Sequence, residues 1–71
     1  MNRVTIYTHP DCPYSFEAKN ELDRNKLEFD EIDLSVNVAA WVDVEQLTGG
    51  QRITPVIVDG DSVTIGFGGV G

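Results

Sequence analysis

The chain has 71 residues, of which 41% are hydrophobic and 24% are charged, so we expect one small domain over residues 1–71. Twelve acidic residues against five basic ones give a net charge of −7. This charge argues against a nucleic-acid partner, which clustered Lys and Arg would bind, and against an anionic membrane surface. A single cysteine cannot form a disulfide within the chain, and neither a signal pattern nor an apolar run of ~20 residues is present, so we expect a cytoplasmic protein.

The first half of the chain predicts a strand, a helix and a second strand. Residues 3–8, RVTIYT, form a β-rich and nearly continuous apolar run, as expected of a buried strand. HPDCP interrupts this run, and residues 13–26 contain no glycine and many good helix formers. Pro13 suits the first turn of that helix, where the missing N–H is no loss. Residues 27–34, LEFDEIDL, alternate apolar and acidic side chains, which predicts a second strand.

The second half predicts a helix and then a hairpin. Ser35 or Asn37 is a candidate cap for a helix that runs through Leu47, because apolar residues recur at helical spacing up to that point. Residues 56–65 read as two short strands around an Asp-Gly turn at positions 59–60. The predicted order is β-α-β-α-β-β, an α/β fold with a mixed four-stranded sheet. We expect the first three strands to pair in parallel through right-handed crossovers, with the last strand antiparallel.

The single thiol stands at the junction of the first strand and the first helix. Cys12 immediately precedes Pro13, so its sulfur should lie over the helix N-terminus, where free N–H groups and the helix dipole favour a thiolate. Ser15, three residues further on, can hydrogen-bond to that sulfur. The alternative is an inert, buried cysteine. The polar neighbour Asp11 and the helix start favour a reactive thiol.

Three stretches of the chain resemble the glutaredoxin branch of the thioredoxin-like superfamily: TIYT, then CPYS, then LTGGQRITPVIV. The ending TIGFGGVG is similar to that of very short glutaredoxin-like proteins, some of which carry selenocysteine at the nucleophile position. The resemblance implies a thioredoxin-like fold without the final helix of the family. It also implies that Cys12 is the nucleophile, and that a cis Pro55 places the backbone of Thr54 opposite the reactive sulfur.

The resemblance further implies a glutathione site, but several side chains of that site differ. Tyr14 and Arg52 match the family, Thr54 stands where the family has a valine before the proline, and Gly68 and Gly69 stand at its glycine pair. The acidic residue that follows this pair in the family has no counterpart. We therefore expect the backbone part of a glutathione site to be present, and most of the charged side chains that hold glutathione in the family (the charged clamp) to be missing.

Three more positions depart from the family pattern. His9 replaces a lysine, Trp41 stands approximately where a polar residue such as glutamine is usual, and Ile53 replaces a threonine. His9 either binds a carboxylate as a cation or only caps and solvates its loop. Trp41 is either a ligand of the substrate or a core residue, as aromatic residues at helical spacing usually are. Glutathione should therefore bind poorly.

These observations predict a thiol-disulfide oxidoreductase of glutaredoxin type that works by a monothiol route. Cys12 would take over the adduct of a protein mixed disulfide, and glutathione or another low-molecular-weight thiol would resolve it. No metal cofactor is expected, since no cluster has metal-ligand spacing. The alternatives are a dimer that binds an iron–sulfur cluster through Cys12, which Pro13 disfavours, and a redox-inactive interaction domain. The sequence leaves the oligomeric state open.

Overall fold

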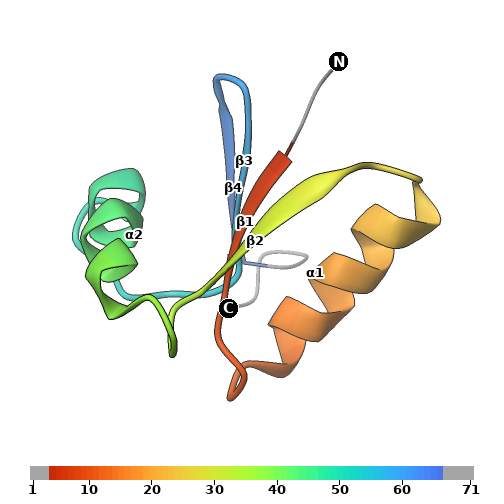
Figure 1. Cartoon of the computed structure of the whole chain (residues 1–71). Coiled ribbons are helices and arrows are strands. Elements are labelled where there is room, and N and C mark those ends of the chain that lie inside the picture. Colours follow the sequence, from red (N-terminus) through yellow and green to blue (C-terminus); the bar gives the residue numbers. More distant parts are fainter. Residues whose placement is uncertain (1–3, 67–71) are drawn as a thin grey trace.

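The computed structural model describes residues 4–66 and shows the predicted order of elements (Figure 1). In chain order these are β1 (Val4–Thr8), α1 (Pro13–Arg24), β2 (Phe29–Asp33), the 3₁₀ turn η1 (Val38–Ala40), α2 (Trp41–Thr48), β3 (Val56–Asp59) and β4 (Ser62–Ile65). The four strands form one mixed sheet in the order β2-β1-β3-β4. The α/β class and the β-α-β-α-β-β succession are confirmed.

One prediction about the sheet is wrong: the first three strands are not all parallel. β1 pairs in parallel with β2, with Tyr7 opposite Ile32, but it pairs antiparallel with β3, with Ile6 opposite Ile57. The reason lies in the chain between α2 and β3. After α2, residues 49–55 lead back to the end of the sheet where β1 finishes, so β3 starts there and runs the opposite way (Figure 1).

The two helices cover opposite faces of the sheet (Figure 1). On one face α1 packs Ala18 and Leu22 against Val4 and Ile6 of β1. The other face carries the α2 side of the core, whose buried members are Tyr7, Leu34, Ala40, Val44 and Val56. β1 supplies both faces because successive side chains of a strand point to opposite sides. This strand is therefore the central element, and its carboxyl end leads directly into the loop that bears Cys12.

The helix ends differ in part from the sequence-based expectations. α1 ends at Arg24, two residues earlier than expected, and Lys26 follows with a positive φ of 56°. Neither residue predicted to cap the second helix makes a capping hydrogen bond with its side chain. The Asn37 side chain makes none, and the Ser35 hydroxyl donates to Asp33 Oδ1 at 2.6 Å. α2 ends at Thr48, and its C-cap residue Gly49 has a left-handed φ of 77°, which suits glycine. Within residues 4–66 no helix has the length and apolar character needed to cross a membrane.

Candidate active site

Cys12 is the N-cap residue of α1, with an extended backbone at φ −102° and ψ 107°. Two backbone hydrogen bonds hold it there: its N–H donates to the carbonyl of His9 at 3.0 Å, and its own carbonyl accepts from the Ser15 N–H at 3.1 Å. Pro13 opens the helix, as predicted. The thiol is partly exposed, so a disulfide can reach it from solvent.

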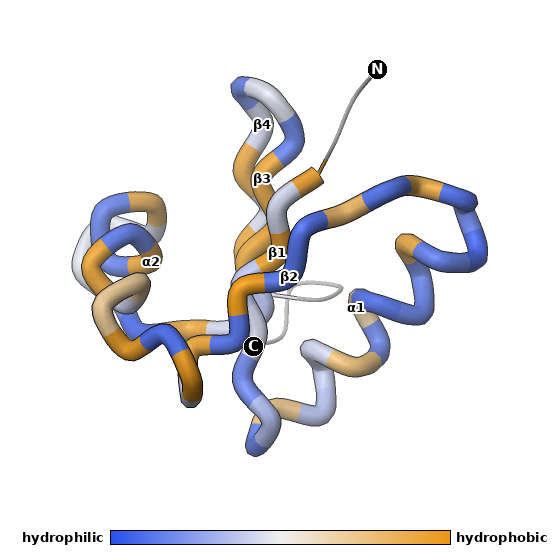
Figure 2. Tube along the Cα trace, in the orientation of Figure 1, coloured by the Kyte–Doolittle hydropathy of each residue, from blue (hydrophilic) through white to orange (hydrophobic). Residues whose placement is uncertain are grey.

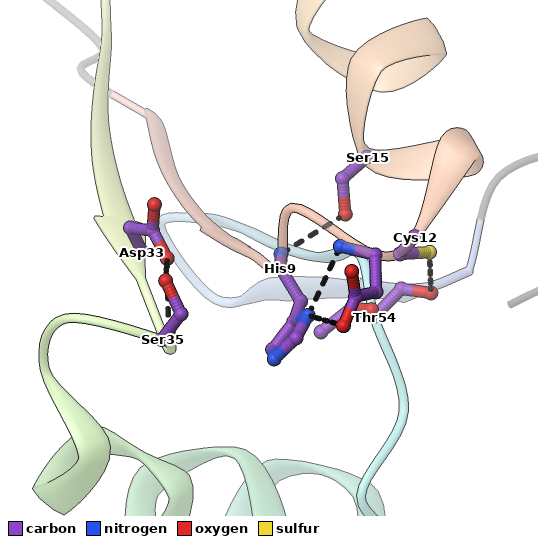
Figure 3. A network of polar contacts seen from close by, with 7 residues as sticks. His9, Cys12, Ser15, Asp33, Ser35 and Thr54 are labelled. Carbon is purple, nitrogen blue, oxygen red and sulfur yellow. Dashed lines mark hydrogen bonds and ion pairs between the residues drawn. The ribbon is translucent and has the colours of Figure 1, made fainter.

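The segment before β3 lies directly opposite the sulfur (Figure 3). The distance between Cys12 Sγ and the carbonyl oxygen of Thr54 is 3.3 Å, a contact in which the protonated thiol donates. The Thr54–Pro55 peptide bond is cis, as the resemblance implied. The Pro55 carbonyl accepts from the Gly66 N–H at 2.7 Å, which joins this turn to the end of β4. Residues that are 42 positions apart in the sequence thus form one site.

The surroundings of Cys12 favour the thiolate. Burial alone would raise the pKa of Cys12, but hydrogen bonds from the Thr54 side chain, from the side chain and backbone of Ser15 and from the Tyr14 backbone outweigh burial, so the pKa lies below that of an ordinary thiol. Two of these donors are the backbone N–H groups of Tyr14 and Ser15 in the first turn of α1, where no carbonyl four residues earlier in the helix is available; the Ser15 N–H also donates to the Cys12 carbonyl. The sequence-based expectation of an activated thiol is therefore supported by the geometry.

Ser15 is the best-buried polar residue beside the sulfur, at 1% exposure. Its hydroxyl oxygen accepts from the His9 N–H at 3.4 Å, a long hydrogen bond that links the loop after β1 to the first turn of α1 (Figure 3). Because the hydroxyl can accept from His9 and donate to the sulfur, Ser15 both orders the loop and supports the thiolate. It has no thiol with which to capture an adduct on Cys12.

His9, Trp41 and Arg52 form a connected group on the α2 side of the site. The rings of His9 and Trp41 have their centroids 6.2 Å apart and are tilted by 41°. The guanidinium of Arg52 lies over the Trp41 ring at 5.4 Å, and its Nε is 3.7 Å from a carboxylate oxygen of Glu45. Trp41 is half-buried and also packs against the core. The core reading of Trp41 is therefore supported, and its role as a ligand of the substrate stays a prediction.

The geometry of His9 favours the second of its two readings, the loop-capping role. Its Nδ1 accepts a hydrogen bond from the Asp11 N–H at 3.1 Å, which requires an unprotonated nitrogen. The Asp11 carboxylate lies 3.8 Å from the same nitrogen, so a protonated ring would also find a partner there. In either form His9 is occupied with its own loop. It does not project a free cation as a lysine at this position would.

The remaining predicted site residues differ in their exposure and in their distance from the core. Tyr14 lies in the first turn of α1 and is 37% exposed, as expected of a surface beside the thiol. Arg52 is exposed, and Ile53 packs against the α2 side of the core. Gly68 and Gly69 lie outside the described residues.

Sequence reasoning missed a polar group behind the site. Glu31 Oε2 accepts from the Thr8 hydroxyl at 2.7 Å and pairs with Lys19 Nζ at 2.9 Å. These residues line a small pocket between α1 and β2, together with His9 and Ser15. Nothing local in the sequence marks the group, because its members belong to β1, α1 and β2. Only the parallel pairing of β1 with β2 brings them together.

Comparison with known proteins shows the family of the chain. The family model described as Glutaredoxin matches residues 4–63. This chain belongs to the glutaredoxin family. It is 38% identical over 68 residues to a glutaredoxin of Neisseria meningitidis, an alignment that covers 94% of this chain and 79% of that protein.

Solved structures agree with this family. The glutaredoxin-like NrdH-redoxin of Escherichia coli, described as having a thioredoxin-like activity profile, superposes with a TM-score of 0.80 at 29% identity and covers 92% of this chain and 83% of that one. A glutaredoxin of Archaeoglobus fulgidus gives a TM-score of 0.81 at 24% identity, over 94% of this chain and 77% of that chain, and supports the fold alone. The thioredoxin-like fold is thereby confirmed, and family membership suggests thiol-disulfide oxidoreductase chemistry.

Proposed function

We propose that this glutaredoxin is a monothiol oxidoreductase in which Cys12 forms and releases mixed disulfides. The observation that carries the proposal is the site itself: the only cysteine of the chain is the N-cap residue of α1, and its thiol faces Thr54 and has a lowered pKa. Ser15 stands where a second thiol would allow an internal disulfide. The chemistry must therefore stop at a mixed disulfide that an external thiol resolves.

The reaction then has two exchanges. The Cys12 thiolate attacks the glutathione sulfur of a glutathionylated protein; a disulfide forms between Cys12 and glutathione, and the protein thiolate leaves. A second glutathione thiolate attacks the glutathione sulfur of that adduct, releasing oxidised glutathione and the Cys12 thiolate. Each step breaks one S–S bond and makes another, and the single free glutathione thiolate that enters in the second step supplies, over the cycle, the electron pair with which the protein thiolate leaves. Both steps benefit from a lowered pKa, because Cys12 attacks in the first step and leaves in the second.

The backbone around Thr54 supports the binding of an extended substrate. The carbonyl of Thr54 already lies 3.3 Å from the sulfur, so a peptide or tripeptide that pairs with this segment would hold its own sulfur beside Cys12. Such backbone pairing gives affinity with little dependence on side chains. Thr54 and Pro55 are accordingly proposed to hold the substrate, with Tyr14 at the side of the thiol.

Glutathione is the first candidate for the co-substrate, since glutaredoxins use it, and another low-molecular-weight thiol is the second. Arg52 is the one cation among the proposed contacts, and it is partly engaged by Glu45 at 3.7 Å. A charge-assisted hydrogen bond is worth roughly 1.5 to 3 kcal/mol. The departures at His9 and Trp41 therefore support weaker binding of glutathione than in a family member with the full charged clamp.

The test is reduction of the mixed disulfide between glutathione and mercaptoethanol at varied glutathione concentration. The wild type should turn over, Cys12→Ser should be inactive, and mass spectrometry should find one glutathionyl group on the wild type after substrate is added without reductant. Ser15→Cys is the matched variant, because the added thiol should divert part of the adduct into an internal disulfide. Turnover by Cys12→Ser, or no adduct on the wild type, would overturn the proposal.

A further inference from the structure

Three valines before and within α2 are unusually exposed. Val36, Val38 and Val42 are 82%, 64% and 56% exposed, and no other large hydrophobic side chain among residues 4–66 except Phe16, at 51%, exceeds 41%. The connection between β2 and α2 accordingly shows strongly hydrophobic colour on the outside of the molecule (Figure 2). Isolated exposed valines need no explanation, but a group within seven residues does.

The valines flank Trp41 in the sequence, and the Trp41 ring lies beside the active-site loop. Val38 and Val42 are four residues apart across η1 and the start of α2, so they lie near one another on successive turns. Trp41 is the neighbour of Val42, and its ring contacts His9. The carbonyl of His9 in turn accepts from the Cys12 N–H. We call Val36, Val38, Trp41 and Val42 the valine surface.

The charge near the valine surface is mainly acidic. Residues 27–51 hold six acidic residues and no Lys or Arg, although Glu31 pairs with Lys19 and Glu45 with Arg52, whose guanidinium lies over the Trp41 ring. Asp43 is exposed beside Val42, and Glu45 is half-buried one turn further along α2. An apolar patch within an acidic field attracts a partner that is itself apolar and basic.

We propose that the valine surface docks protein substrates whose glutathionylated cysteine lies in an apolar, basic segment. This inference rests on the proposed monothiol function and names its substrate class. The partner's apolar side chains cover the valines, its basic side chains face Asp43 and Glu45, and its mixed disulfide reaches Cys12. Contacts with the protein part of the substrate thereby supply binding free energy that the missing charged contacts to glutathione would otherwise provide.

The experiment compares two glutathionylated peptides of equal length, each with one central cysteine. One carries Leu and Lys on both sides of the cysteine, and the other carries Ser and Glu. The wild type should have a kcat/KM about ten times higher for the first peptide, and added salt should reduce that ratio, since the attraction between charges is screened. The mixed disulfide of glutathione with mercaptoethanol reports the chemistry without docking.

The decisive variant is Val38→Ser combined with Val42→Ser, which removes apolar area at exposed positions. It should lose about threefold to tenfold in kcat/KM for the Leu/Lys peptide, given the area that two valines can bury, and nothing for the small disulfide. Val63→Ser is the matched control: Val63 is 41% exposed, but it lies in the β3–β4 hairpin, at the opposite end of the sheet from the Cys12 loop (Figure 1). It should leave both substrates unchanged.

Binding can be followed separately from chemistry. In Cys12→Ser, NMR titration with the reduced Leu/Lys peptide should shift the amide signals of residues 36–43, and the Ser/Glu peptide should not. Equal kcat/KM for the two peptides together with no such shifts would overturn the docking surface, even if the small disulfide is turned over normally. Loss of small-disulfide turnover with these shifts retained would instead overturn the proposed function alone. A concentration-dependent dimer that the double valine variant abolishes would assign the surface to a second copy and overturn the proposal.

Discussion

Removal of the Ser15 hydroxyl should make Cys12 a weaker nucleophile at neutral pH. The hydroxyl and the backbone N–H of Ser15 both lower the pKa of Cys12, against the effect of burial and beside a larger contribution from Thr54. Ser15→Ala keeps the backbone N–H and the Thr54 hydroxyl and deletes one donor. The pKa of Cys12 should therefore rise, and the thiolate fraction at pH 7 should fall.

The size of the effect follows from the exposure of the sulfur. A hydrogen bond to a charged group is worth about 1.5 to 3 kcal/mol when it is not replaced. Cys12 is only partly buried, so water takes over some of this interaction, and we expect about 0.7 to 1.4 kcal/mol to be lost. The rate of iodoacetamide alkylation at pH 7 should fall about threefold to tenfold, with the midpoint of its pH profile moved upward.

Two controls separate this effect from general damage to the loop. Ser35→Ala removes a hydroxyl that donates to Asp33 rather than to the sulfur, and it should leave alkylation unchanged. Alkylation of Ser15→Ala above the upper midpoint should match that of the wild type, because the thiolate is then fully formed in both. An unchanged or lowered midpoint in Ser15→Ala would refute the role assigned to the hydroxyl.

Three further changes test other parts of the structure. Burial raises the pKa of Glu31, but hydrogen bonds from Lys19 and Thr8 lower it below its usual value. Glu31→Gln should therefore lower the free energy of unfolding, measured in urea at pH 7, by about 0.5 to 1 kcal/mol. This difference should vanish as the pH falls through the folded-state pKa of Glu31. Gly49→Ala should lower the free energy of unfolding by about 1 kcal/mol in the same measurement. The loss comes from the φ of 77° alone, because no atom would crowd the new Cβ. Gly49→Asn should lower the free energy of unfolding by less, because asparagine tolerates this conformation better. His9→Lys should lower the apparent KM for glutathione, more at low salt than at high salt; an unchanged KM would place recognition elsewhere.

The sequence was sufficient where local chemistry decides the structure. Strand β1, the start of α1 at Pro13 and the hairpin turn at Gly60 follow from apolar runs, proline and an Asp-Gly pair. The cis bond before Pro55 followed from the family resemblance and not from physical pattern. The position of Cys12 at the helix N-terminus needed only the junction of a strand and a helix.

The sequence was insufficient where distant segments decide. The direction of β3 depends on how far residues 49–55 carry the chain after α2, and strand periodicity contains no such information. The group of Thr8, Lys19 and Glu31 likewise exists only through the parallel register of β1 and β2. Of the predicted caps, Asn37 is the N-cap residue of the 3₁₀ turn that leads into α2, but its side chain makes no capping hydrogen bond, and α2 itself starts at Trp41.

Reactivity and recognition in this protein depend on different kinds of atoms. The thiolate is supported by backbone N–H groups at the start of α1 and by two buried hydroxyl-bearing residues, and it faces a backbone carbonyl. Most of these groups persist through substitution of nearby surface side chains. In the proposed mode of binding, by contrast, a substrate meets side chains of the β2–α2 connection and of the segment before Pro55. A change in those side chains can therefore redirect the protein to another partner while the chemistry at Cys12 stays the same. A supported thiolate together with the weaker glutathione binding proposed above would result from such a change, and for that reason substrate preference is measured best at the valine surface and reactivity at Ser15.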